Sequence, residues 1–198
     1  MPQTLLDISM SLDGFIADQD GGDGGLHAWL FAGDVPVHAG GMTFRLTSQA
    51  SADVFASFVD SLGAFVIGAR AFANIGESPP FGLPTFVVTH SEREPMNKGA
   101  PICFVTAGVR AAIDAGRAAA GAKNLGVFGG ADIARQCLQA GVIDELRISL
   151  VPKLLGSGIP LFTHGWSQTR ELECTAATAG SGVNHLAFRV RSAGRPAG

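Results

Sequence analysis

Two consecutive glycines, Gly129 and Gly130, are the residues with the clearest potential for ligand binding. They follow a short apolar run, Leu125–Phe128, and precede a segment that begins at Ala131. If that segment is a helix, its first backbone N–H groups have no partner within the helix, and glycines let an anion come close to them. A tight turn without a ligand would need the same residues. The glycine pair therefore predicts either an anion site or a plain turn.

The elements on either side must position this glycine pair. The run Leu125–Phe128 is too short for a helix and is flanked by turn residues, so it predicts a buried strand. After the glycines, apolar residues recur as pairs four apart, which is one stripe of a helix, and Gly141 stands where a left-handed C-cap belongs. A second apolar segment, Arg147–Val151, predicts another strand, which stops at Pro152.

Strands and helices alternate along most of the chain. Apolar runs predict strands at Thr4–Met10, Ala64–Ile67, Thr85–Thr89 and Ile102–Val105, and a closing hairpin of Glu171–Ala177 and His185–Val190. Helical stripes occur at Ser51–Leu62, with Ser51 as the N-cap, at Gly68–Phe72 and at Val109–Gly116. The glycine-rich segment from Gly14 to Ala50 has no regular pattern, which is typical of an active-site loop or of a loop that only covers the core.

This alternation predicts an α/β fold with a central, mostly parallel sheet flanked by helices, and the final hairpin predicts an antiparallel edge. Residues 1–191 are expected to form one domain, and 192–198 a flexible tail. In such sheets, ligands lie beyond the carboxyl ends of the strands. Gly68, His90, Val105 and Gly129 all stand at such ends, so one cleft is expected there.

Two distant motifs resemble one family. The run from Gly129 to Phe162, GGADIARQCLQAGVIDELRISLVPKLLGSGIPLF, resembles the C-terminal signature of the dihydrofolate-reductase-like superfamily. It is most similar to the reductase domain of bacterial riboflavin biosynthesis and its stand-alone relatives. The segment Ser9–Ala17, SMSLDGFIA, resembles that family's first strand and following turn. The resemblance extends over most of the chain and implies a dihydrofolate-reductase-like fold and an oxidoreductase that uses NADPH.

The resemblance also implies where the cofactor binds. Gly129 and Gly130 match the family's glycine pair, in which a cis peptide bond is usual. The backbone N–H groups that would then meet the pyrophosphate belong to Ala131, Asp132 and Ile133.

A second cofactor-binding turn matches the family's pattern only in part. The family's Gly-Arg-x-Thr turn corresponds to Gly68–Ala71, but here the arginine is displaced to Arg70 and the threonine is absent. Arg70 would meet the 2′-phosphate of NADPH through charge-assisted hydrogen bonds, or it would lie in solvent, so the choice between NADPH and NADH stays open. His90 and Arg93 are further candidates for the adenosine side, or plain surface-turn residues.

Hydride transfer to a C=N or C=O bond also needs a proton donor. Asp13 lies just past the first strand, beside the expected nicotinamide pocket, although a turn with Gly14 would explain it equally well. Asp53 precedes Gly68 by almost the spacing of the helix-borne acid of dihydrofolate reductase, but an acid in a first helical turn also complements the dipole. Asp144 and Glu145, between a helix and a strand, are expected to be mainly structural. No nucleophile–base pair or metal-ligand set appears, so no metal is expected.

Composition narrows the class of protein. Of the 198 residues, 46% are hydrophobic and 16% are charged, which favours a well-packed interior over disorder. A net charge of −3 and the lack of a basic cluster argue against a nucleic-acid partner, and no apolar run is long enough for a membrane span. The three cysteines have no metal-ligand spacing, so buried free thiols are expected for Cys103 and Cys137. A reducing cytoplasm fits these features.

The sequence thus predicts an NADPH-dependent reductase of a small heterocycle, pteridine- or pyrimidine-like; the alternative is a non-catalytic nucleotide- or ligand-binding protein that retains the fold. Phe15 and Trp29 are expected to contact the substrate. Phe15 replaces the lysine of the family's usual Ser-Leu-Asp-Gly-Lys-Ile-Ala turn, so the ribosylated pyrimidine of the riboflavin pathway is not the expected substrate. The resemblance implies a homodimer, because the family is commonly dimeric. The apolar residues Leu186 and Phe188 would also leave an exposed strand edge in a monomer.

Overall fold

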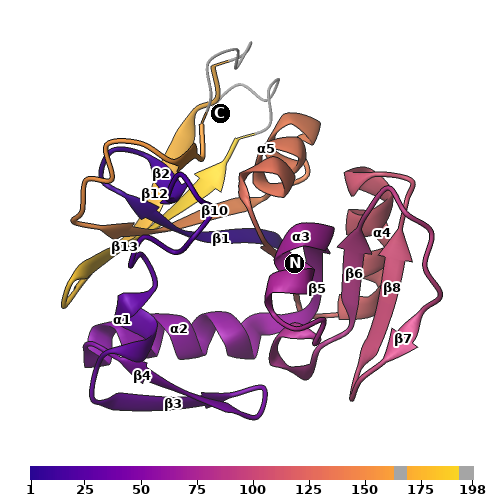
Figure 1. Cartoon of the computed structure of the whole chain (residues 1–198), viewed down its shortest axis with the longest axis horizontal. Helices are drawn as coiled ribbons and strands as arrows, with labels where there is room; N and C mark the ends of the chain where they lie inside the picture. Colours follow the sequence, from indigo (N-terminus) through magenta and orange to yellow (C-terminus); the bar gives the residue numbers. More distant parts are fainter. Residues whose placement is uncertain (163–168, 192–198) are drawn as a thin grey trace.

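A large, mostly parallel sheet organises the chain, as the sequence predicts. The computed structural model describes residues 1–162 and 169–191. The strands of the sheet are β1 (Thr4–Ser11), β5 (Leu62–Gly68), β6 (Thr85–Val88), β7 (Met96–Asn97), β8 (Pro101–Val105), β9 (Asn124–Phe128), β10 (Glu145–Val151), β12 (Leu172–Gly180) and β13 (Val183–Val190). Their order across the sheet is β12-β13-β10-β1-β9-β5-β6-β8-β7 (Figure 1).

Strand direction divides the sheet into a parallel centre and antiparallel edges. β1 pairs in parallel with both β10 and β9, and the parallel ladder continues through β5 and β6 to β8. At the other side β13 runs antiparallel to β10 and to β12, which confirms the closing hairpin. The carboxyl ends of the parallel strands therefore meet on one side of the molecule, which we call the carboxyl edge.

Helices cover both faces of the sheet (Figure 1). Helices α4 (Val109–Ala120) and α5 (Ala131–Ala140) place apolar side chains against one face, where they meet Leu6 and Ile8 of β1. The opposite face is covered by α2 (Gln49–Ser61), whose Phe58 packs with Leu5. Side chains alternate between the faces of a strand, so consecutive residues of β1 enter different cores.

The predicted caps are right for one helix and wrong for the other. Gly141 ends α5 in the left-handed conformation, with φ 67° and ψ 30°, as predicted. Helix α2 begins earlier than expected, because its N-cap is Ser48, whose hydroxyl accepts a hydrogen bond from the amide of Ser51 at 3.2 Å. Ser51 is therefore a buried residue of the first turn and does not cap the helix.

The glycine-rich segment between Gly14 and Ala50 is more regular than the sequence suggests. It contains β2 (Phe15–Ala17), the short helix α1 (Ala28–Phe31) and a hairpin of β3 (Val35–Ala39) and β4 (Met42–Leu46). Its aromatic side chains pack on α2, with the rings of Phe44 and Phe55 4.7 Å apart between centroids. The glycines mark turns between short elements, which the lack of a periodic pattern concealed.

The expectation for the cysteines is only partly right. Cys137 is buried, where burial raises the pKa of its thiol to about 12, but Cys103 is half-buried. All three cysteines are free, and Cys174 is exposed on β12. Among the described residues, no helix has the length and apolar character needed to cross a membrane.

The face of the sheet beneath α2 carries charged residues as well as a core. Asp7 of β1 lies opposite Arg147 of β10 in register, and the Arg147 Nε to Asp7 Oδ2 distance is 3.3 Å. Arg147 also pairs with Glu145 at 3.4 Å, and its guanidinium carbon lies 5.1 Å from the centroid of the Phe58 ring. Burial raises the pKa of Asp7 from 3.8 to about 6, although Arg147 opposes this change.

This pKa predicts a pH-dependent stability. Because the folded protein binds the Asp7 proton more tightly than the unfolded chain, the contribution of Asp7 to stability is lost as pH rises from about 4 to about 6. Relative to an Asp7→Asn variant, the wild-type free energy of unfolding should fall over this range, by on the order of 2–3 kcal/mol, and stay constant above it. Urea denaturation of both proteins across the range measures this; a difference independent of pH would contradict it.

Candidate active site

The glycine pair lies at the carboxyl edge, between β9 and α5. Gly129 has φ 134°, a conformation that side chains rarely allow, whereas Gly130 has φ −69° and ψ 175° and is the N-cap of α5. The first α-helical hydrogen bond runs from the amide of Ala134 to the carbonyl of Gly130. The three amides that precede Ala134 thus have no acceptor within the helix. None of the described peptide bonds is cis, which differs from the usual bond of the family.

The turn after β5 packs directly against the turn after β9. A Cβ atom at Gly68 would lie 2.6 Å from Cγ1 of Ile133, and one at Gly129 would lie 3.3 Å from Cβ of Ala71. Both positions therefore need glycine for close packing. A Cβ atom at Gly130 would meet nothing within 4 Å, so this glycine faces open space. The start of α5 and the start of α3 (Ala69–Asn74) are consequently neighbours at the carboxyl edge.

Two of the three basic candidates are exposed near these turns. Arg70 lies on α3 and His90 follows β6, and in the structure neither has a hydrogen bond or ion pair with a described residue. Gly68 at the end of β5 pairs in register with Val88 at the end of β6, which brings the two segments to the same side. Arg93 instead donates two hydrogen bonds to Glu77, at 2.8 and 3.0 Å, and lies over the ring of Phe104.

Asp13 anchors the loop that follows β10. Its carboxylate accepts hydrogen bonds from the hydroxyl of Ser11 at 2.6 Å and from the amides of Leu155 and Gly156 at 3.2 and 2.7 Å. These bonds, the one from Ser11 first, lower the pKa of Asp13. A carboxylate held in its ionised form accepts protons poorly and has none to donate. The contacts are those of a structural anchor, and the predicted role of Asp13 as proton donor stays a prediction.

Asp53 lies on the outer side of α2. It is exposed, and its carboxylate accepts a hydrogen bond from Nε2 of Gln49 at 2.7 Å. The residues of the same helix that face inward include Ser51, Ala52 and Phe55. The spacing in sequence therefore places Asp53 on the same helix as expected but not on the face that meets the sheet.

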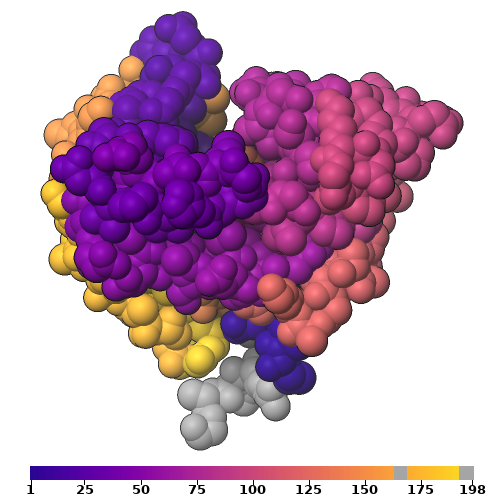
Figure 2. Space-filling model, turned by 90° about the horizontal axis from the view of Figure 1, so that it is seen from below, coloured from indigo at the N-terminus to yellow at the C-terminus, as the bar shows by residue number. Residues whose placement is uncertain are grey.

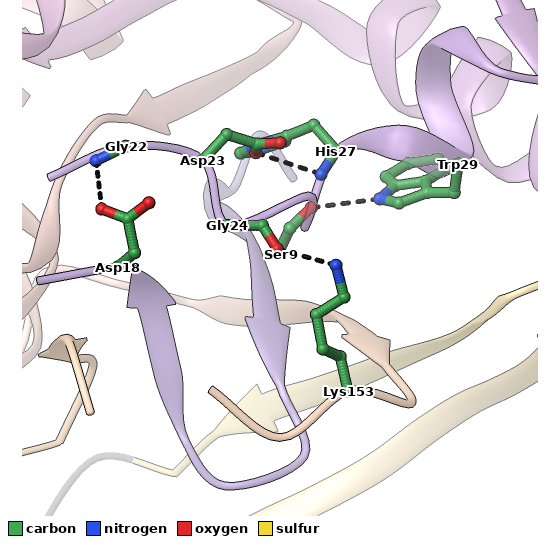
Figure 3. Close-up of polar contacts among 8 residues, drawn as sticks. All are labelled: Ser9, Asp18, Gly22, Asp23, Gly24, His27, Trp29 and Lys153. Atoms are coloured by element: carbon green, nitrogen blue, oxygen red, sulfur yellow. Dashed lines mark hydrogen bonds and ion pairs between the residues drawn. The ribbon is translucent and has the colours of Figure 1, made fainter. Parts of the chain in front are cut away.

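Trp29 reaches the sheet, as Figure 3 shows. It is buried, and its indole Nε1 donates a hydrogen bond to the hydroxyl of Ser9 on β1 at 3.1 Å. Its ring packs edge-on against His185, with 4.8 Å between the centroids. Phe15 begins β2 and is half-buried, and its amide donates to the hydroxyl of Ser11 at 2.9 Å. Both predicted substrate residues thus adjoin the carboxyl half of β1.

Lys153 connects the glycine-rich segment to the end of β10 (Figure 3). Its ammonium donates a hydrogen bond to the carbonyl of Gly24 at 2.8 Å, and a Cβ atom at Gly25 would lie 2.5 Å from Nζ. The backbone carbonyl of Lys153 accepts from the amide of Leu12 at 2.9 Å, which ties the ends of β10 and β1 together. Lys153 was not predicted from the sequence. The available signal was its position just after Pro152, which stops the strand.

A buried histidine was also missed. His185 on β13 is 6% exposed, and its two ring nitrogens lie 3.1 Å from the hydroxyl of Ser149 and 3.0 Å from that of Ser51. Burial, and next the charge of Arg147, lowers the pKa of His185 to about 4. The imidazole is therefore neutral at neutral pH. Its inward position in the alternating pattern of the last strand was the signal, but a single histidine in such a pattern predicts no role.

The carboxyl edge is hollowed. Figure 2 shows a notch between the indigo-to-purple N-terminal part of the surface and the magenta part that includes α3. The glycine turns, Arg70 and His90 come from elements on the magenta and orange side, and the Asp13 turn comes from the N-terminal side. In the described part of the chain, no three His, Cys, Asp or Glu side chains are grouped as metal ligands.

Comparisons with known proteins agree with this fold. The uncharacterized protein YwjB of Bacillus subtilis is 25% identical over 172 residues, which cover 85% of this chain and 87% of YwjB. A crystal structure of a putative riboflavin biosynthesis protein from Shewanella sp. PV-4 matches with a TM-score of 0.72 and 21% identity, over 96% of this chain and 99% of that one. Dihydrofolate reductase from Enterococcus faecalis, complexed with NADP(H), has the same fold, with a TM-score of 0.60, 13% identity and coverage of 96% and 97%.

The family model carries the assignment beyond fold. The model of the RibD C-terminal domain matches residues 2–186, which is nearly the whole described chain. Because this match includes the β1 turn, both glycine turns and the first strand of the closing hairpin, the chain belongs to the RibD C-terminal domain family, a family of reductase type.

Proposed function

We propose that the protein is an NADPH-dependent reductase that transfers a hydride to a small heterocyclic substrate. The observation that carries this proposal is the open start of α5, where Gly130 has free space in front of three amides without helical acceptors. A pyrophosphate fits such a site because its oxygens accept hydrogen bonds and its charge is favoured by the helix dipole. The dihydrofolate reductase of the same fold is complexed with NADP(H), which supports this choice of cofactor.

In this proposal the residues of the carboxyl edge divide the cofactor among them. Gly129 and Gly130 admit the pyrophosphate, and the amides of Ala131–Ile133 hold it. Arg70 and His90 are exposed on adjoining elements and are left to meet the adenosine side, with the Arg70 guanidinium on a 2′-phosphate. Bound NADPH supplies a hydride at its nicotinamide ring.

The substrate is placed on the N-terminal side of the notch. Phe15 is half-buried and offers an aromatic surface near Ser11 of β1, which favours a flat ring over a charged group. Trp29 is buried behind Ser9, so its part in the proposal is to support this wall. A pteridine- or pyrimidine-like ring fits this description. All three cysteines are free thiols, which suits a reducing cytoplasm as the place where the protein acts.

A non-catalytic ligand-binding protein is the second candidate. One observation favours it: Asp13 accepts three hydrogen bonds that lower its pKa, and Asp53 faces outward, so neither carboxylate is poised as a free acid at the carboxyl edge. Such a protein would bind NADPH without oxidising it. Turnover therefore separates the two candidates.

The first test is NADPH oxidation, followed by absorbance at the nicotinamide band, with a panel of pterins, dihydropteridines and aminopyrimidines. We expect turnover with a flat substrate that has no phosphate, and roughly tenfold to over a hundredfold less efficient turnover with the phosphoribosylamino-pyrimidine of the riboflavin pathway. A substrate phosphate that has lost its lysine partner costs about 1–3 kcal/mol, or roughly tenfold to over a hundredfold in binding. Turnover of that pyrimidine at an ordinary enzymatic rate would show that Phe15 does not decide specificity.

A Gly130→Val variant tests the cofactor site directly. Its backbone angles are open to any residue and a Cβ atom has free space, so the protein should fold, while the side chain occupies the pyrophosphate position. We expect isothermal titration to detect no NADPH binding. Gln139→Val, at the exposed far end of the same helix, is the matched control and should bind NADPH like the wild type. Equal affinity in Gly130→Val would rule out this site.

We also propose a homodimer. The edge predicted from Leu186 and Phe188 is wrong, because β13 carries both residues and is paired on both sides, with β10 and β12. The edge strand β12 spans nine residues, and its exposed side chains include Leu172, Ala176 and Ala177, so its outer hydrogen-bonding groups and apolar surface need cover. Light scattering at micromolar concentration should give twice the mass of one chain. Because a lysine on an edge strand opposes pairing, Ala177→Lys should shift this mass towards that of a monomer. A wild-type monomer at that concentration would contradict the proposal.

A further inference from the structure

A cavity of about 220 Å³ lies beneath α2, on the face of the sheet that carries the charged residues. Its wall includes Val54 of α2 and side chains from four neighbouring strands, β1, β10, β13 and β12. The cavity is smaller than the ~300–1,000 Å³ usual for drug-sized ligands, so it suits a single ring or a group of similar size.

Two carboxylates and one guanidinium line this cavity. Asp7 and Glu145 each contact Arg147 through one oxygen, at 3.3 and 3.4 Å. The side chains of Asp7 and Arg147 are 28% and 20% exposed, so the three groups are shielded from bulk water but not sealed from it. With both carboxylates ionised, the three groups together carry a net charge of −1. An incoming anion would meet a guanidinium that is already paired.

Acceptor atoms remain free in the cavity wall. Each carboxylate has one oxygen without a hydrogen-bond partner among the described residues, Oδ1 of Asp7 and Oε2 of Glu145. A carboxylate oxygen can accept two hydrogen bonds, so both atoms are available to a donor. The hydroxyl of Thr178 on β12 also lines the cavity and has no partner in this part of the chain. Ser149 and His185, 5% and 6% exposed, complete the polar wall, and their mutual hydrogen bond holds them in place.

These observations define a ligand rich in N–H donors. A planar N–C–N group carries N–H donors on both nitrogens, so one such group can donate to one oxygen on each of two carboxylates. We propose that this cavity is a second ligand site, which binds a small planar amidinium-type cation against Asp7 and Glu145.

The cavity differs in place from the carboxyl edge. Asp7 precedes Ser11, the last residue of β1, by four positions, which is roughly 13 Å along a strand. Glu145 is the first residue of β10 and thus lies at the strand end opposite to the glycine turns. Ligand binding in this cavity should therefore be independent of cofactor binding at the carboxyl edge, and the two sites are tested separately.

Three probes of one shape and different charge test the proposal. Benzamidinium, benzamide and benzoate are titrated calorimetrically into the full chain at neutral pH. We expect benzamidinium to bind at one site per chain, benzamide at least tenfold more weakly, and benzoate not at all at millimolar concentration. Equal binding of benzoate, or no heat from benzamidinium, would overturn the proposal.

Variants locate the binding. Asp7→Asn and Glu145→Gln each remove one charge with little change of shape, and each should weaken benzamidinium binding at least tenfold. Glu94→Gln, an exposed carboxylate away from the cavity, is the matched control and should leave the dissociation constant unchanged. Unchanged affinity in both cavity variants would place the probe elsewhere.

Two further measurements separate the cavity from the carboxyl edge. Benzamidinium binding should be the same with saturating NADPH present and in the Gly130→Val variant. If NADPH competes with the probe, the binding belongs to the carboxyl edge and the second site is refuted. If Gly130→Val fails to bind NADPH but still binds benzamidinium, both the cofactor site and the cavity site are supported.

Discussion

The close approach of two turns at the carboxyl edge is the constraint on which the rest of the arrangement depends. β5 and β9 are neighbours in a parallel sheet, so the turns after them must pass one another, and Gly68 and Gly129 leave the space that this requires. A Cβ atom at Gly68 would collide with the side chain of Ile133 on α5, and Gly129 has a φ of 134° that side chains rarely allow. With the space kept, both helices begin side by side, and Gly130 is left open towards solvent.

A different constraint acts across the sheet. The face beneath α4 and α5 is an apolar core, whereas the face beneath α2 combines aromatic packing with buried polar groups. Charges in such a place must be paired, and Asp7 and Arg147 are. Burial raises the pKa of Asp7, and the same carboxylate lines the cavity, so this polar face lowers stability at neutral pH and carries the proposed second ligand site.

Long-range contacts join the segments that border the notch. Asp13 accepts hydrogen bonds from amides after β10, Lys153 donates one to the carbonyl of Gly24, and Trp29 donates one to the hydroxyl of Ser9. Each contact joins residues far apart in sequence, so the N-terminal side of the notch is a single unit built from three segments. A change in any of these side chains would therefore remove one of the contacts that join the segments.

The sequence by itself determined the α/β architecture, the glycine turn before α5, its left-handed C-cap and the closing hairpin, because these depend on local periodicity and on glycine. Only the tertiary structure decided that Asp53 faces outward, that Asp13 binds the amides of Leu155 and Gly156, and that His185 is buried beside Ser149 and Ser51. It also decided that Arg147 pairs with Asp7 and that Lys153 binds the carbonyl of Gly24. The physical reason is that a side chain's chemistry depends on partners from other strands. Strand order and register set those partners, and no local pattern encodes them.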